Sequence, residues 1–149
     1  MPILAATRLS TVFALILLLT ACTDPLISIP GGRLSGEAAS VPAKWTSVPD
    51  VVQVEFRPDD PYSINIWAVV TDGALYIATQ DARWVPMIEA NPEVRFRVDE
   101  KVYEMKAVRV TDETRAQTIG KTYEQKYDYT MDADQSLASA DVFQLVPRS

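Results

Sequence analysis

Residues 64–79 are almost continuously apolar apart from one turn, and they read Ile64-Asn65-Ile66-Trp67-Ala68-Val69-Val70-Thr71-Asp72-Gly73-Ala74-Leu75-Tyr76-Ile77-Ala78-Thr79. A run of β-branched and aromatic residues that is apolar on nearly both faces is typical of a central strand. The pair Asp72-Gly73 is a signal for a two-residue hairpin turn, because both residues tolerate the positive φ that such a turn needs. The segment therefore predicts two antiparallel strands at the centre of a sheet.

The flanking sequence predicts four further strands. Apolar and polar residues alternate over 51–56, 94–98 and 101–110, as they do in strands that bury one face and expose the other. In the first of these strands, Gln53 and Glu55 are expected on the exposed face. Residues 142–146 form a final short apolar strand.

Two helices are predicted between these strands. A short helix over about 84–90 ends at Asn91-Pro92, because the residue before a proline disfavours helix. A longer helix over about 112–127 begins with acidic residues and places Ile119, Tyr123 and Tyr127 along one stripe. The fold class is therefore mainly β (α+β): a small, six-stranded, mostly antiparallel barrel with two peripheral helices.

The first 21 residues have the profile of a secretory signal. Arg8 is their only charged residue, and an apolar run over 9–21 follows it. As a helix this run rises only about 20 Å, which is too short for a bilayer core of about 30 Å. The residues Leu19-Thr20-Ala21-Cys22 resemble the lipobox of bacterial lipoproteins, in which the cysteine is acylated and becomes the N-terminus. An ordinary signal peptide cut elsewhere is the alternative, but Cys22 is the only cysteine in the chain, so no internal disulfide competes for its thiol.

This interpretation divides the chain into a signal peptide over 1–21, a lipidated tether over 22–49 and a barrel domain over 50–149. Proline and glycine are frequent in the predicted tether, as in linkers. We expect an exported protein that is lipid-anchored to the cell envelope, facing the periplasm from the inner or outer membrane if the cell is Gram-negative. The formal net charge of −6 argues against nucleic acid as a partner and leaves membrane binding to the lipid.

Several kinds of chemistry lack their usual residues. The chain has no histidine, and its single cysteine is predicted to carry lipid, so no metal site is expected. No Gly-x-Ser-x-Gly motif and no glycine-rich phosphate loop occur. The residues themselves identify neither a catalytic group nor a cofactor.

Three parts of the chain, residues 67–79, 83–95 and 123–127 with 143–148, together resemble an uncharacterised family of split β-barrels. That family is distantly related to the pyridoxamine-phosphate-oxidase-like and deazaflavin-dependent nitroreductase barrels. The resemblance implies a split barrel, a flavin or deazaflavin as the kind of cofactor to consider, and a homodimer, since related barrels build cofactor sites between two chains.

The resemblance also implies a ligand site. In the flavin-binding relatives, a strand that ends in threonine and a following basic segment hold the cofactor phosphate, and here Thr79 and Arg83 match those positions. Gln80 lies between them as a further donor, and Trp84 offers a flat face to a ring. The match is incomplete, because Asp81 stands where the relatives have small hydroxyl or basic residues.

Each of these residues also has a structural interpretation. Arg83 is then a surface arginine paired with Asp81 or Glu89, and Trp84 packs beneath the short helix. A weaker set of pocket candidates comprises Tyr123, Lys126 and Tyr127. Their alternative is aromatic packing, with the Lys126 amine extending to water.

Three functions follow from these observations. The leading hypothesis is a membrane-tethered lipoprotein whose barrel binds a small anionic or flavin-like ligand near Thr79, Gln80, Arg83 and Trp84. The second is a cofactor-free structural or protein-interaction lipoprotein of the envelope. The third, held less strongly, is a flavin- or deazaflavin-dependent reductase.

Overall fold

The computed structural model describes residues 24–128 and 140–149. The predicted signal peptide and Cys22 lie outside these residues. Two α-helices, α2 (Val85–Ala90) and α3 (Glu113–Tyr127), accompany one sheet. Within the described ranges the strands are β1 (Glu37–Ala39), β2 (Val52–Phe56), β3 (Tyr62–Ile66), β4 (Ala68–Thr71), β5 (Ala74–Thr79), β6 (Glu93–Val98), β7 (Lys101–Arg109) and β8 (Asp141–Pro147).

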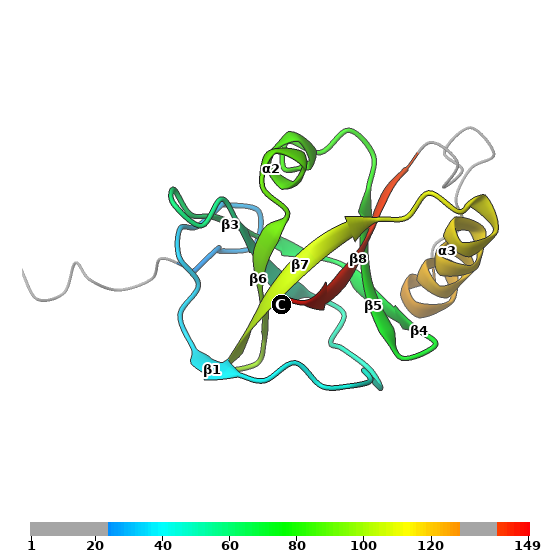
Figure 1. The fold of residues 1–149 in the computed structure, drawn as a ribbon, viewed down its shortest axis with the longest axis horizontal. Helices are drawn as coiled ribbons and strands as arrows, with labels where there is room; N and C mark the ends of the chain where they lie inside the picture. Colours follow the sequence, from blue (N-terminus) through cyan, green and yellow to red (C-terminus); the bar gives the residue numbers. More distant parts are fainter. Residues whose placement is uncertain (1–23, 129–139) are drawn as a thin grey trace, which may run out of the picture.

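The sheet is antiparallel apart from one added strand. Its strand order is β3-β2-β6-β7-β8-β5-β4, and β1 pairs with β7 in parallel. The two end strands of this order, β3 and β4, are consecutive in sequence and are separated only by Trp67. One run of chain therefore supplies both ends of the strand order, and the curved sheet forms a split β-barrel (Figure 1).

All six predicted strands are present, but the sheet of the described residues has eight strands, so the predicted count of six is wrong. The predicted strand over 64–70 is divided at Trp67, because its first half pairs with β2 and its second half pairs with β5. The other additional strand, β1, lies in the segment that was expected to be a tether. The predicted hairpin is confirmed: Thr71 pairs with Ala74, and Asp72 and Gly73 have φ of 53° and 79°.

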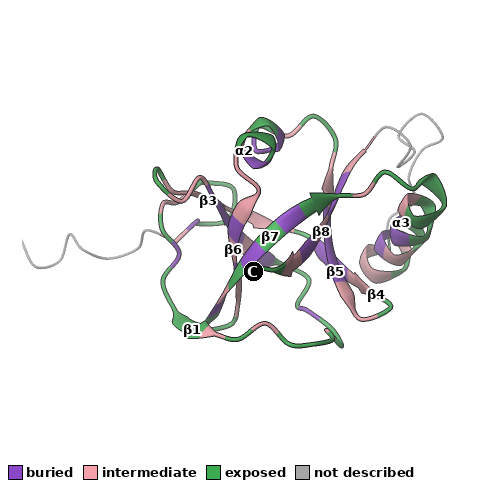
Figure 2. Ribbon diagram, viewed as in Figure 1, coloured by how far each residue is buried: buried purple, intermediate pink, exposed green. Residues whose placement is uncertain are grey.

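Two groups of apolar residues hold the fold together. The larger fills the barrel, where the rings of Phe56 and Trp84 stack with their centroids 5.2 Å apart. The smaller lies between α3 and the outer face of the sheet, where Ile119 and Tyr123 pack against Tyr76. Figure 2 shows the inward face of α3 as buried and its outward face as exposed. The longer helix is thus confirmed, and the Asp112 side chain caps its start by accepting a hydrogen bond from the Arg115 backbone N–H (2.6 Å).

Residues 24–49 do not form a free tether. Leu34 and Val48 are buried, and Trp45 packs edge-on against Phe96. Gly36 has a φ of +139°, and a Cβ there would lie 2.7 Å from the Glu100 carbonyl oxygen. Gly36 is required for the close approach of this segment to the β6–β7 turn, although the composition of the segment resembles that of a linker. The expectation of a tether over 22–49 is therefore wrong for the residues that the structure describes, because these residues pack along the barrel.

The segment also buries a face of β2 that was predicted to be exposed. Glu55 is only 2% exposed. Its Oε2 atom accepts a hydrogen bond from the Leu34 backbone N–H (2.7 Å) and forms an ion pair with Arg95 (2.8 Å). Arg95 in turn donates to the Leu34 carbonyl oxygen and pairs with Glu104. The face of β2 that was expected to be exposed to solvent is therefore covered at Glu55 and forms a buried polar layer.

Candidate functional site

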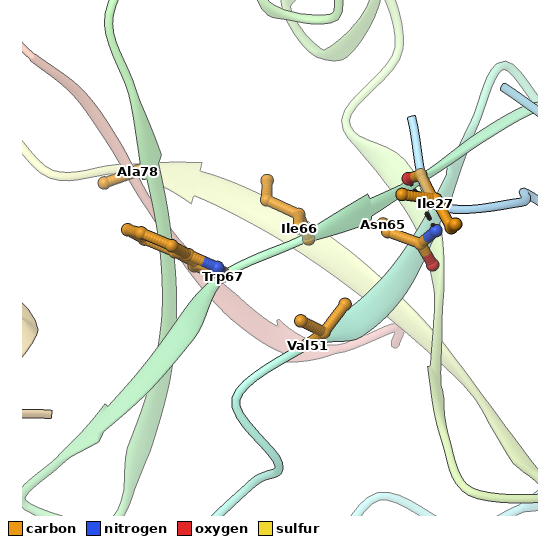
Figure 3. Close-up of a pocket in the computed structure, with 6 residues that line it drawn as sticks. All are labelled: Ile27, Val51, Asn65, Ile66, Trp67 and Ala78. Carbon is orange, nitrogen blue, oxygen red and sulfur yellow. Dashed lines mark hydrogen bonds between the residues drawn. The ribbon is translucent and has the colours of Figure 1, made fainter. Parts of the chain in front are cut away.

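An open cavity of about 650 Å³ lies beside the break between β3 and β4. Its lining residues are mainly apolar and come from four parts of the chain: Ile27, Val51, Asn65, Ile66, Trp67 and Ala78 (Figure 3). This volume lies within the range of about 300–1,000 Å³ that is usual for small-molecule sites. A mainly apolar lining with one amide side chain suits a flat, largely apolar ligand.

Trp67 is the aromatic group of this cavity. Its ring stacks on the ring of Tyr127, with centroids 4.4 Å apart and an angle of 8° between the planes. It is nevertheless 48% exposed, whereas the rings of the barrel interior are almost fully covered. The stack fixes the orientation of the indole while leaving much of it accessible to solvent.

The three residues Tyr123, Lys126 and Tyr127 attach α3 to the barrel. The Lys126 amine donates to the carbonyl oxygens of Val48, Pro49 and Ala68, each at 2.9 Å. The Tyr127 hydroxyl accepts from the Ala68 N–H (3.1 Å), and its proton lies within reach of carbonyl oxygens, one of them at 2.7 Å. These polar atoms are bound to backbone, so the set contributes to the cavity through the stack of Tyr127 on Trp67.

Burial changes the acidity of all three groups. It raises the pKa of the Tyr123 hydroxyl well above its ordinary value of 10.0, and the charge of Tyr127 adds to the increase. Burial also raises the pKa of Tyr127. Burial lowers the pKa of Lys126, and the Asp50 carboxylate partly opposes that change.

The raised pKa of Tyr123 predicts that the protein loses stability in alkaline solution. Because its folded pKa is raised, the folded protein keeps a proton that the unfolded chain loses above pH 10, so stability falls as pH rises beyond that value. Tyr123→Phe removes this titration. In thermal or urea unfolding between pH 8 and pH 11, the variant is expected to lose less stability above pH 10, by up to about 1.4 kcal/mol per pH unit. Parallel curves for the two proteins would contradict the assignment.

The residues that the sequence proposed for ligand binding lie at a neighbouring turn between β5 and α2. Ala78 faces the cavity, so Thr79, the next residue of the strand, points to the opposite face. Gln80 and Arg83 are exposed on the turn. The expected partner Glu89 pairs with Arg109 instead.

Trp84 does not lie at the surface. It is 4% exposed and packs between Phe56 and Phe143 inside the barrel. Of the two interpretations of this residue, the structure places the indole where the packing interpretation requires it. The tryptophan that lines the cavity is Trp67, which the sequence pattern placed in a central strand.

The remaining residues of the cavity were also missed. Asn65 was the one available signal, because it is an amide within an apolar run. Its Nδ2 atom donates to the Ile27 carbonyl oxygen (2.8 Å), which fixes the loop over 24–31 at the cavity rim. Ile27 belonged to the predicted tether, so nothing in the local pattern placed it at a site.

Two features of the described residues bear on metal and membrane binding. Within residues 24–128 and 140–149, the acidic side chains form no group of three or more that could hold a metal ion. In the same ranges, no helix has both the length and the hydropathy needed to span a bilayer.

Comparison with known families gives this site a context. The sequence model of the F420H(2)-dependent quinone reductase family matches residues 65–142, just over half of the 149-residue chain. The chain belongs to this family. The match begins at Asn65 and contains Trp67 and Ala78 of the cavity as well as the turn that carries Arg83. No curated protein sequence matches the chain.

Solved structures share the fold of this quinone reductase family member. A FAD-binding protein from Mesorhizobium loti is 16% identical with a TM-score of 0.55, over 69% of this chain and 84% of the other. A conserved hypothetical protein from Mycobacterium tuberculosis is 17% identical with a TM-score of 0.58, over 68% and 74%. An F420 reductase is 16% identical with a TM-score of 0.51, over 69% and 90%. These likenesses confirm the split-barrel fold that the sequence predicted. The family match supports the predicted distant relationship to the deazaflavin-dependent barrels.

Proposed function

We propose that the protein is a lipid-anchored split barrel that binds a flavin-like ring in the cavity beside Trp67. The observation that carries this proposal is the half-exposed Trp67 ring, held by its stack on Tyr127 at the wall of an apolar cavity. Membership of a quinone reductase family supports a flavin or deazaflavin as the ligand class. The lipid anchor rests on the lipobox-like residues that end at Cys22.

The residues fit the two ends of such a ligand differently. The flat ring suits the apolar walls formed by Val51, Ile66 and Trp67. A phosphate needs a cation, and Arg83 lies five residues beyond Ala78, a span of at most about 18 Å along the chain. A guanidinium forms charge-assisted hydrogen bonds to phosphate, so Arg83 is the group that we assign to the anionic end.

A reductase is the second candidate, and the family match is the observation that favours it. A reduced deazaflavin or flavin supplies a hydride when it is bound. The residues of this chain would bind the ring, orient it against Trp67 and exclude water from its apolar side. A homodimer remains a prediction in either case.

Ligand binding is tested by titrating the detergent-solubilised, full-length protein with flavin mononucleotide, riboflavin and deazaflavin. We expect Trp67→Ala to weaken the binding of all three compounds about tenfold, because a stacked aromatic pair contributes about 0.5–1.5 kcal/mol beyond its buried area. Arg83→Ala is expected to lower the affinity for flavin mononucleotide by about tenfold or more. The affinity for riboflavin should not change, since riboflavin carries no phosphate. Fluorescence quenching or calorimetry measures both effects.

Val108→Ala is the matched control, because Val108 is also an exposed apolar residue (45%) but lies outside the cavity. It is expected to bind all three rings like the unaltered protein. A protein that binds none of them would contradict the proposal and would favour a cofactor-free envelope protein.

A further inference from the structure

The cavity is surrounded by an unusual concentration of exposed apolar side chains. Among the described residues, the large hydrophobic side chains that are exposed number six, and five of them lie in the 26–29 loop or in the cavity wall. We call these five the apolar rim: Leu26 (59% exposed), Ile27 (92%), Ile29 (64%), Val51 (54%) and Trp67 (48%). Exposed apolar clusters of this kind are typical of contact surfaces on soluble proteins.

The loop that carries three of these residues has a fixed conformation. The backbones of Leu26 and Ile29 exchange hydrogen bonds of 3.0 and 2.6 Å, and the Asn65 side chain holds the Ile27 carbonyl oxygen (2.8 Å). Ile27 has a φ of +48°, a left-handed conformation that is costly for a β-branched residue. An isoleucine that is almost fully exposed adds little to the packing of the fold, so packing of its side chain does not account for the strain.

The apolar rim also lies next to the predicted anchor. Asp24 is fixed to the barrel, because its carboxylate pairs with Arg97 (2.6 Å) and accepts a hydrogen bond from the Ser35 N–H (2.8 Å). Cys22 precedes Asp24 by two residues, and two Cα–Cα steps span at most about 7.6 Å. Leu26 follows Asp24 by two residues. A lipid on Cys22 therefore brings this part of the barrel to the membrane surface.

We infer that the apolar rim inserts into the bilayer interface and turns the mouth of the Trp67 cavity toward the lipid. The inference rests on the proposed lipid anchor, and it commits to lipid as the occupant because the anchor holds the rim at the membrane. Apolar and aromatic side chains bind this interface by burying area at the boundary between headgroups and acyl chains. The arrangement gives a membrane-dissolved ring compound direct access to the cavity.

The test uses the full-length lipidated protein in phosphatidylcholine–phosphatidylglycerol vesicles. The thiol of Cys22 is consumed by lipid, so a single cysteine introduced by Ile27→Cys accepts an environment-sensitive fluorophore selectively. The exposed apolar residue outside the rim gives the control variant Val108→Cys. Lipids brominated along their acyl chains are expected to quench the label at position 27 several-fold more strongly than the label at position 108. Without any label, the same lipids are expected to quench the unaltered protein more than the Trp67→Phe variant, whose remaining tryptophans are the buried Trp84 and the partly buried Trp45, which packs against the core.

The outcomes separate the anchor from the docking surface. Mass spectrometry of the N-terminal peptide reports the anchor in the same sample, and an unmodified Cys22 would overturn the anchor and the docking surface together. An acylated Cys22 with equal quenching at both positions would overturn the docking surface alone. A label at position 27 that is shielded from water but not quenched by brominated lipid would indicate a second copy of the chain, and it would also overturn the inference.

Discussion

Replacing Trp84 by alanine is expected to lower the free energy of unfolding by about 3–5 kcal/mol, the usual cost of truncating a buried aromatic side chain. Trp84 is 4% exposed and fills the space between Phe56 and Phe143. The variant therefore leaves a large cavity in the barrel, and the surrounding strands can close it only in part. Urea unfolding followed by circular dichroism measures the loss.

The matched substitution is Trp67→Ala. This ring is 48% exposed and stacks mainly on Tyr127, so its removal is expected to cost much less stability while it weakens ligand binding. The two substitutions thus compare a tryptophan of the core with one at the proposed site. Equal losses of stability in the two variants would contradict this assignment.

The second large effect is expected for Glu55→Ala, which should cost about 3 kcal/mol because it breaks a buried ion pair and leaves a buried N–H without its acceptor. Glu55 receives the hydrogen bond of the Leu34 N–H and pairs with Arg95. The hydrogen bond fastens the N-terminal segment to β2, and the ion pair joins β2 to β6. Chemical unfolding measures the loss, and limited proteolysis around Leu34 is expected to become faster as well.

Glu104→Ala is the control, since Glu104 pairs with the same Arg95, and also with Arg148, but its side chain is 51% exposed. An exposed pair contributes at most about 1 kcal/mol. If the two glutamate variants lost the same stability, the buried position of Glu55 would not be the cause of its effect.

Glu55 also shows where prediction from sequence reached its limit. The alternation of residues 51–56 gives the strand and its register, since period-2 patterning is a local property. It does not reveal what covers the polar face. Here the cover is the segment around Leu34, whose proline and glycine residues have the composition of a linker. A packed extended segment and a free linker share that composition, and only long-range contacts distinguish them.

The candidate site was less predictable than the fold. Local patterns indicate the predicted strands, the Asp72-Gly73 hairpin and both helices, and the family resemblance implies the split barrel. The choice between Trp67 and Trp84 depends on burial, which neither residue's neighbours in sequence determine. Ile27 and Asn65 reach the cavity through a loop and a strand that are far apart in sequence, so no local signal joined them.

The attachment of α3 to Ala68 has a consequence for aggregation. Both backbone groups of Ala68, at the start of β4, are bound by side chains of Lys126 and Tyr127. β4 ends the strand order, and unpaired groups on such a strand can add a strand from another molecule. The helix thus occupies backbone groups at this edge that could otherwise pair with another strand. Partial detachment of α3, well before the barrel itself unfolds, is the step at which we expect neighbouring molecules to begin to associate.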